Sequence, residues 1–334
     1  MLILRDLQYR KWRVLVVAVL MAVVLTLLFI MSGLVGQFRY EPVSATLRAG
    51  GSANWVVSES STGPLTSPTA LSVEMMAGIE GEPVLIGMGS LDGLRSAVIG
   101  RSYGSGEPTL IDGRYPESEA ELVIDDSAGY RVGETVDLGA EQATVVGLTE
   151  GATILAGVPM SFATLGYAQE VVASGRPVVT GVLTPDPATS PPAGLKLMSA
   201  DDVAADGLVP LENAIGSVSL VRALLWLITL IIIAAVIYIT ALERTRDFAV
   251  LKAVGANNRS LGLSLVVQGV IMAVVATLLA AVLQNFVTPL FPMTVRVTGS
   301  IFWQILIGSV VVALVAGVAG ASRVSNTAPA EAFG

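Results

Sequence analysis

The side chains that most often carry out chemistry in proteins are scarce or absent in this sequence. Its 334 residues include no histidine and no cysteine, which excludes a serine–histidine nucleophilic system, an imidazole-ligated haem or zinc site and a disulfide. The lysines are Lys11, Lys196 and Lys252, and none follows the strand and glycine-rich turn that cradle a nucleotide phosphate. We therefore expect a non-catalytic chain that binds no cofactor and cannot hydrolyse ATP itself.

Acidic side chains are the one chemically active type that gathers locally. They are Glu117, Glu119, Glu121, Asp125 and Asp126. Five carboxyl groups so close in sequence could mark a cation site, but their spacing is not that of a calcium-binding loop. Asp125 and Asp126 are neighbours, so on a strand their side chains would point to opposite faces. We interpret the cluster as solvated surface and predict no metal site.

The overall composition points to a protein of the lipid bilayer. Apolar residues make up 53% of the chain and charged residues 14%, against about 25% charged in a typical soluble domain. The charge is also sorted along the chain. Residues 36–217 carry 23 acidic and 8 basic side chains, whereas the remainder carries 4 acidic and 11 basic ones.

Four apolar stretches are long enough to cross a bilayer, which requires about 20 helical residues. The predicted spans are residues 14–35, 218–242, 261–283 and 301–322. The first could be a secretory signal with Arg10, Lys11 and Arg13 as its basic end. Its apolar stretch is too long for a signal and no convincing small-residue cleavage site follows, so we interpret it as an uncleaved anchor.

Basic residues near the predicted spans indicate the orientation. Lysine and arginine flank the first span on its N-terminal side, fill the loop between the second and third spans, and occur again after the fourth. The loop between the third and fourth spans carries only Arg296. Because such residues favour the cytoplasmic side, both termini are predicted to be cytoplasmic and residues 36–217 to lie outside.

The predicted fold class is an α-helical membrane protein with four transmembrane helices and one α+β extracytoplasmic domain inserted between the first two. Short β-rich runs separated by Gly, Pro and Asp turns support the domain. The predicted strands are 54–58, 121–124, 135–138 and 143–146, and helices could form at 71–76 and 161–169. The remaining segments are an interfacial helix at 1–13, a coupling helix at 243–260, an outer loop at 284–300 and a cytoplasmic tail at 323–334.

Small residues occur in the first and fourth predicted spans. Ser32 and Gly36 lie four apart on the first, and Gly317 and Gly320 lie on the fourth. Such residues let helix backbones approach closely in lipid, but glycine is also simply common in membrane helices. We assign no dimer face to them.

The loop between the second and third spans carries the strongest functional signal. After a charged start come the apolar residues Phe248, Val250, Leu251 and Val254, which predict a short helix with one apolar face. Gly255 can adopt a positive φ and end that helix. A short cytoplasmic helix held between two membrane helices would deliver a force applied to it to both of them.

At these residues the sequence resembles the FtsX-like, or MacB-type (type VII), ABC transporter permeases. The stretch 243–255, ERTRDFAVLKAVG, is similar to the loop signature of the family, and the C-terminal stretch 327–334, TAPAEAFG, to its terminal element. The runs 110–116, 119–124, 132–136 and 143–147 resemble its extracytoplasmic core domain. Within this family, the length of the chain and the run PLFPM at 289–293 most resemble the DevC/HrtB-like permeases of actinobacteria.

The resemblance implies a dimeric permease of the bacterial plasma membrane that pairs with two copies of a separate ABC ATPase. ATP and Mg²⁺ would be bound by that partner, lipid would surround the spans, and no nucleic acid is expected. The family is thought to work by mechanotransmission, in which closure of the ATPase moves the outer domain. The residues expected to dock on the ATPase are Glu243, Arg246, Phe248, Lys252 and Gly255, with Leu4, Leu7 and Trp12 of the interfacial helix as added apolar contacts. Anchoring by positive charge is the alternative explanation of the loop charges.

The family resemblance also suggests what such a complex does. The expected function is export of an amphiphilic or membrane-embedded substrate such as haem, a lipid, a peptide or a drug. Met75, Met76 and Met88 could ligate haem, although methionine is more often packing material. The alternative is an FtsX-like regulator that activates an extracellular partner such as a peptidoglycan hydrolase.

Overall fold

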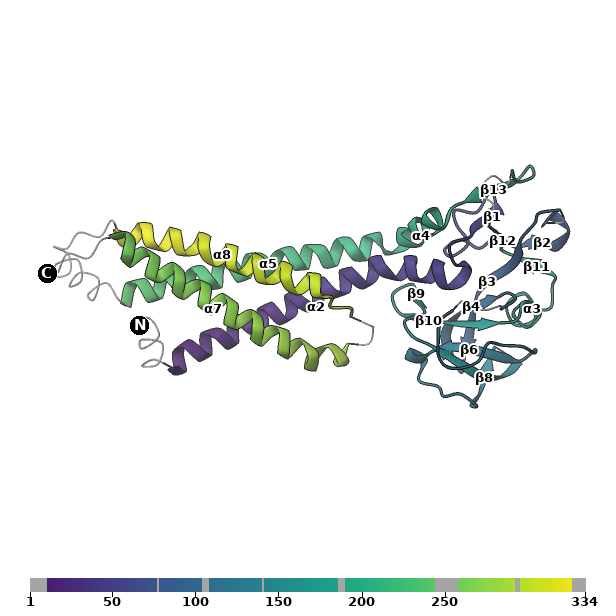
Figure 1. The fold of residues 1–334 in the computed structure, drawn as a ribbon, viewed down its shortest axis with the longest axis horizontal. Helices are drawn as coiled ribbons and strands as arrows, with labels where there is room; N and C mark the ends of the chain where they lie inside the picture. Colours follow the sequence, from purple (N-terminus) through teal and green to yellow (C-terminus); the bar gives the residue numbers. More distant parts are fainter. Residues whose placement is uncertain are drawn as a thin grey trace. The chain divides into compact units, whose positions relative to one another are not determined.

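The computed structural model describes residues 11–76, 78–103, 108–139, 141–185, 190–243, 258–291 and 295–325. The chain divides into two compact units. Residues 1–36 and 215–334 form a helical unit, and residues 37–214 form a unit that we call the sheet domain. Figure 1 shows the helices and strands of both.

Four helices are long and apolar enough to cross a membrane, as the sequence predicted. They are α2 (Lys11–Gly50), α5 (Glu212–Glu243), α7 (Asn258–Val287, followed by the 3₁₀ turn η4, Thr288–Leu290) and α8 (Gly299–Ser325). Each runs without interruption, because a helix satisfies its own main-chain hydrogen bonds where lipid offers no partners.

Small side chains on α7 let the other helices of the helical unit pack closely against it. Ala273, Ala276 and Ala280 recur at helical spacing and are fully buried. The hydroxyl of Thr26 on α2 donates to the carbonyl of Ala280 at 3.5 Å, and the hydroxyls of Thr277 and Ser309 on α8 are 3.0 Å apart. These contacts are the close packing and interhelical hydrogen bonding that hold helices together in lipid.

Glycines make further close approaches within the helical unit. A Cβ added at Gly317 on α8 would lie 2.9 Å from Val266 Cγ2 on α7, and one added at Gly308 would overlap the Trp226 ring on α5. Gly36 lies next to Ile301, where an added Cβ would be 3.5 Å from its Cδ1. Both Gly36 and Gly317 therefore serve packing within the chain.

The sheet domain is built on an eleven-stranded mixed sheet with order β13-β1-β12-β3-β4-β10-β6-β8-β5; β7 also pairs with β3 and β8, and β9 with β10. Its strands are β1 (Asn54–Ser58), β3 (Glu82–Leu91), β4 (Leu94–Gly100), β5 (Leu110–Gly113), β6 (Glu121–Asp125), β7 (Thr135–Leu138), β8 (Glu141–Thr149), β9 (Thr153–Ile154), β10 (Val158–Ala163), β12 (Gly181–Thr184) and β13 (Leu195–Met198). Strands β2 (Leu71–Ser72) and β11 (Val178–Val179) form a separate pair. The helical elements are α3 (Leu165–Ala173), α4 (Ala200–Leu208) and the 3₁₀ turns η1 (Val73–Met76), η2 (Asp126–Ala128) and η3 (Val209–Leu211).

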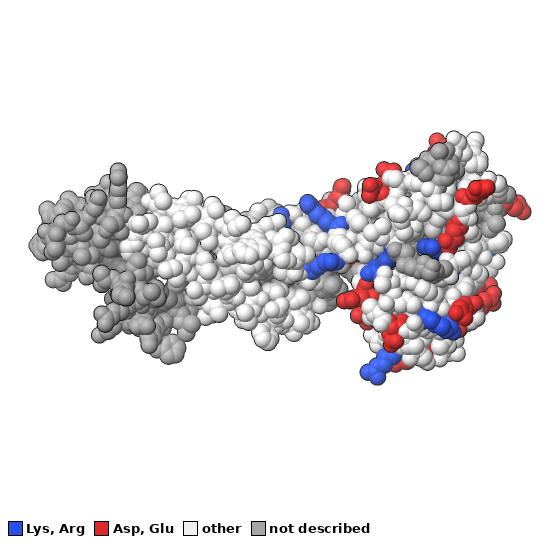
Figure 2. Space-filling view, in the orientation of Figure 1, with Lys and Arg blue, Asp and Glu red and all other residues white. Residues whose placement is uncertain are grey.

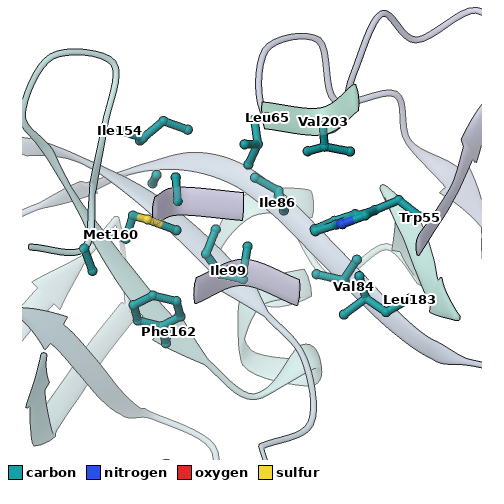
Figure 3. Packing of buried hydrophobic residues seen from close by; sticks show 14 of the residues in the cluster. Trp55, Leu65, Val84, Ile86, Ile99, Ile154, Met160, Phe162, Leu183 and Val203 are labelled. Atoms are coloured by element: carbon teal, nitrogen blue, oxygen red, sulfur yellow. The ribbon is translucent and has the colours of Figure 1, made fainter. Parts of the chain in front are cut away.

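Both faces of the sheet are buried, so its central strands alternate between two cores. On β3 and β4, Ile86 and Ile99 point into a core that also contains Ala45 and Ala49 of α2 and Val203 of α4. Figure 3 shows part of this core, with Trp55, Ile99 and Phe162 among its side chains. Alternate residues such as Leu85 and Val98 enter a second core that is covered by α3.

Glycines on β3 and β4 explain how α3 approaches the sheet. A Cβ at Gly87 would overlap Val172, and one at Gly100 would overlap Ala168. The absent side chains let the helix lie directly on the strands.

The four predicted strands of this region are all present in the structure. The two helical predictions are right only in part. Residues 71–72 form β2 before the turn η1, and residues 161–163 belong to β10. The reason in the second case is pairing: Ser161 and Phe162 lie between β4 and β6 in the sheet, so α3 begins only after the N-cap Thr164.

Two helical glycines allow a matched test of the packing in the helical unit. We expect Gly308→Ala to destabilise the full chain by about 1–3 kcal/mol, since the new methyl group would overlap Trp226. Gly216→Ala is the control, because nothing lies within 4 Å of a Cβ at Gly216; it should be neutral or stabilise by up to about 1 kcal/mol. Thermal unfolding of the detergent-solubilised protein would measure both. Equal midpoints for the two variants would contradict the packing.

Candidate coupling site

The predicted ATPase-docking residues begin where α5 ends. Glu243 is the last residue of α5, and α7 begins at Asn258. Arg246, Phe248, Lys252 and Gly255 fall between these helices, outside the described residues. Apart from Glu243, the predicted docking residues therefore fall on the connection between α5 and α7, residues 244–257.

Of the three residues predicted to make apolar contacts from an N-terminal interfacial helix, the structure describes one. Trp12 lies in the first turn of α2, so at this point the helix already continues into the first span. Leu4 and Leu7 lie outside the described residues.

The two helices that flank residues 244–257 contact each other. A Cβ at Gly269 on α7 would lie 2.9 Å from Ile237 Cδ1 on α5, and both Ile237 and Ala273 are buried in the same apolar cluster. The connecting segment is therefore flanked by two helices that contact each other.

At its other end, α2 is held by the sheet domain. The last turns of the helix carry Ala45 and Ala49 into the domain core. Arg48 donates from Nη1 to Thr149 Oγ1 at 2.9 Å and also to the carbonyl of Glu150, at the end of β8. The helix end is therefore fixed by both apolar and polar contacts.

A second arginine completes this attachment from the sheet side. Arg101, just after β4, donates from Nη1 to the carbonyl of Ala49 at 2.8 Å and forms an ion pair with Glu82 at 3.0 Å. It thereby satisfies one of the carbonyls that a helix leaves free at its C-terminus. The terminus of α2 is capped by the domain itself.

Helix α4, which precedes α5 in the chain, contacts other parts of the same domain. Asp206 on α4 accepts a hydrogen bond from the hydroxyl of Thr66, and a Cβ at Gly207 would lie 2.8 Å from the Cβ of Pro42 on α2. The chain continues from α4 through η3 directly into α5. Helix α4, which leads through η3 into α5, thus packs on α2 where Gly207 meets Pro42.

Glu121, in the acidic cluster noted in the sequence, is held by hydrogen bonds within the sheet domain. Glu121 receives hydrogen bonds from the guanidinium of Arg114 at 2.8 and 2.6 Å and from the backbone N–H groups of Glu117 and Ser118. The bonds from Arg114, and then that from Glu117, hold the pKa of the Glu121 carboxyl well below its usual range. This carboxylate supports a turn.

The neighbouring aspartates differ in exposure, but not because they alternate along a strand, since β6 ends at Asp125 and Asp126 begins η2. The interpretation of the cluster as solvated surface is wrong for Asp125. Asp125 is fully buried and accepts from the N–H and hydroxyl groups of Ser127, whereas Asp126 is exposed. Although Asp126 is exposed, neighbouring protein atoms remove part of its hydration, and this desolvation, together with the nearby Asp125 and Glu150 carboxylates, raises the pKa of Asp126. Among the residues that the structure describes, no group of three or more His, Cys, Asp or Glu side chains is placed to hold a metal ion.

Among the described residues, charged side chains are concentrated on the sheet domain (Figure 2). Figure 2 shows acidic and basic groups over its surface, while the described faces of the long helices are largely uncharged. The three methionines considered for haem differ in exposure, since Met75 and Met88 are exposed and Met76 is buried among apolar residues.

Sequence reasoning missed the attachment of α2 to the sheet domain. Charged Arg39 and Glu41 and then Pro42 follow the first predicted span, and these residues suggest a helix end, yet the helix continues to Gly50. A usable signal was the recurrence of Phe38, Ala45 and Ala49 at helical spacing, since all three are buried.

Comparison with known proteins agrees with this architecture. Residues 219–329 match the FtsX-like permease C-terminal family. Two proteins of Mycobacterium tuberculosis H37Rv, both named uncharacterized ABC transporter permease (Rv0072 and Rv2563), are 31% and 32% identical to the chain over 343 residues. Each alignment covers 99% of this chain and 98% of the relative. An uncharacterized ABC transporter permease of Mycobacterium bovis is likewise 32% identical over the same coverage. The chain therefore belongs to the FtsX-like ABC transporter permeases, the family that its loop motif predicted.

Proposed function

We propose that this permease converts ATP hydrolysis by a separate ABC ATPase into movement of its sheet domain, and that this movement drives export of an amphiphilic or membrane-embedded substrate. Haem, lipids, peptides and drugs are the substrate classes considered. The functional complex would contain two copies of the permease and two of the ATPase, with ATP and Mg²⁺ bound by the ATPase.

The observation that carries this proposal is the full-length similarity to ABC transporter permeases in a chain that has no nucleotide-binding motif of its own. The relatives match 99% of the sequence, and no G-x-x-x-x-G-K-[ST] loop occurs anywhere in it. An ABC permease without a phosphate-binding loop needs a partner to hydrolyse ATP.

The helices supply a mechanical route for the coupling. Helix α2 has 40 residues, which corresponds to about 60 Å at 1.5 Å per residue, whereas a bilayer core requires only about 20 residues. The rest of the helix continues into the sheet domain without a break. A long helix of this kind can transmit a displacement beyond the hydrocarbon core.

We place the ATPase contact at residues 243–260. Glu243, Arg246, Phe248, Lys252 and Gly255 form the docking element in this proposal, and Leu4, Leu7 and Trp12 add apolar contacts from an interfacial helix. The contact between α5 and α7 supports this placement, because it joins the two helices on either side of the element. Both termini and this element would be cytoplasmic, and the sheet domain extracytoplasmic.

Replacing two side chains of the docking element tests its role. We expect Phe248→Ala combined with Lys252→Ala to reduce co-purification of the cognate ATPase at least tenfold, because an apolar anchor and a cation are lost together. The control is Phe286→Ala combined with Arg95→Ala, which removes one exposed aromatic and one exposed cationic side chain elsewhere in the chain and should leave association unchanged. Full retention of the ATPase by the first variant would defeat the assignment.

Substrate transport is tested on the assembled complex in nanodiscs. We expect ATPase activity to rise severalfold with an amphiphilic compound from one of the four proposed classes. Stimulation solely by a secreted protein would instead indicate a regulator of an extracellular partner.

The proposed orientation can be checked by labelling, since the chain contains no cysteine. In intact cells, a membrane-impermeant maleimide should modify Ser90→Cys, an exposed site on the sheet domain. It should modify Thr245→Cys only after the membrane is permeabilised. Labelling of both sites in intact cells would overturn the orientation.

A further inference from the structure

A buried carboxyl group joins α2 to a distant turn of the sheet domain. The side chain of Glu41 is 1% exposed. Its Oε2 accepts a hydrogen bond from the backbone N–H of Ala156 at 2.7 Å, and its Oε1 accepts one from Gly157 at 2.8 Å. Each oxygen therefore has its own donor, and the donors are more than 100 residues away in the sequence.

The turn that receives Glu41 has an unusual backbone. Leu155, Ala156 and Gly157 have φ values of 53°, 67° and 104°, between strands β9 and β10. The left-handed region is unfavourable for residues with a side chain, and two such residues in succession need support from their surroundings. The two hydrogen bonds from Glu41 supply that support, because they fix the N–H groups of the turn in one direction.

Pro42, the next residue of α2, is a weak point in the helix. Proline has no N–H, so it cannot donate to the carbonyl of Phe38, and the helix lacks one bond there. A helix that carries a load bends most easily where a hydrogen bond is missing. Glu41 fastens the helix to the domain beside that position, and Gly207 of α4 packs directly on Pro42.

A buried carboxyl group needs donors at this position. Burying it removes it from water, and the two hydrogen bonds from the turn offset that cost, whereas an apolar side chain would leave both N–H groups without this acceptor. Within the described residues, no arginine or lysine forms an ion pair with it. What Glu41 adds is direction, since two hydrogen bonds hold the helix to one turn in one geometry.

We propose that Glu41 is a positioning residue for coupling: by binding the N–H groups of Ala156 and Gly157 beside Pro42, it makes the end of α2 and the sheet domain move as one body. This proposal rests on the proposed function, in which ATP hydrolysis moves the sheet domain. In this proposal, the Glu41 side chain passes a displacement of α2 on to the sheet domain.

The variant that tests the proposal is Glu41→Gln. Glutamine has nearly the same size, but its amide replaces one acceptor oxygen by an NH₂ group, which would face a backbone N–H. Glu121→Gln is the control, because Glu121 also accepts from two consecutive backbone N–H groups, while its hydrogen-bond partners Arg114, Glu117 and Ser118 are not part of α2. Should Glu41→Gln fail to fold, Glu41→Asp keeps the carboxyl group and shortens its reach.

Two pairs of spin labels separate the relevant motions in the permease–ATPase complex. The pair Ser90→Cys with Ser300→Cys reports on the sheet domain relative to the helical unit, and the pair Val43→Cys with Ser90→Cys reports on α2 relative to the sheet domain. All three positions are exposed. Labelled protein is diluted into unlabelled protein, and distances are measured by electron paramagnetic resonance without nucleotide and with ATP and vanadate.

With Glu41 present, we expect ATP and vanadate to shift the Ser90–Ser300 distance and to leave the Val43–Ser90 distance unchanged. Glu41→Gln should reduce the first shift at least twofold and broaden the second distribution, while ATPase activity persists. Glu121→Gln should behave as the unmodified protein. The proposal is overturned if Glu41→Gln keeps the full Ser90–Ser300 shift and a narrow Val43–Ser90 distribution.

The same data separate this proposal from the proposed function. Absence of any Ser90–Ser300 shift with Glu41 present would refute ATP-driven movement of the domain. In that case the width of the Val43–Ser90 distribution without nucleotide still decides whether Glu41 holds the helix to the domain.

Discussion

The main-chain polar groups of a membrane-spanning segment have to be satisfied within that segment, and this constraint underlies the rest of the structure. Hydrocarbon offers no hydrogen bonds, so the spans are continuous helices. Lipid also gives apolar side chains little reason to prefer a neighbouring helix, so association depends on close approach. The buried alanines of α7 and the glycine that faces Trp226 meet that need. The result is a helical unit in which a shift of one helix is felt by its neighbours.

The sheet domain is stabilised by different means, and these explain how it can hold a helix end firmly. Without cysteine it has no disulfides, and its sheet is instead buried on both faces by two apolar cores. The end of α2 supplies Ala45 and Ala49 to one of those cores. Arg48 and Arg101 then satisfy polar groups at the edge of the same contact. The helix terminus is consequently a structural part of the domain.

The sequence predicted those features that depend on local composition and period. Apolar runs of about 20 residues identified the spans, and short β-branched runs between turns identified strands such as 54–58 and 135–138. The extent of α2 was not predictable in this way. Glu41 and Arg48 have the character of solvated residues, and their partners are 115 and 101 residues away. The proposed docking segment rests on its motif alone, because it resembles a family signature and lies outside the described residues.

A long helix is a useful lever only if it is stiff where it meets its load. In α2 the missing hydrogen bond at Pro42 lies where the helix enters the sheet domain. Bending there would absorb a displacement before it reached the sheet. The flanking contacts oppose that bending on two sides, since Glu41 binds the β9–β10 turn and Gly207 of α4 packs on the proline ring. Because α4 leads through η3 into α5, the contact at Pro42 also joins α2 to the segment that continues into the second long helix.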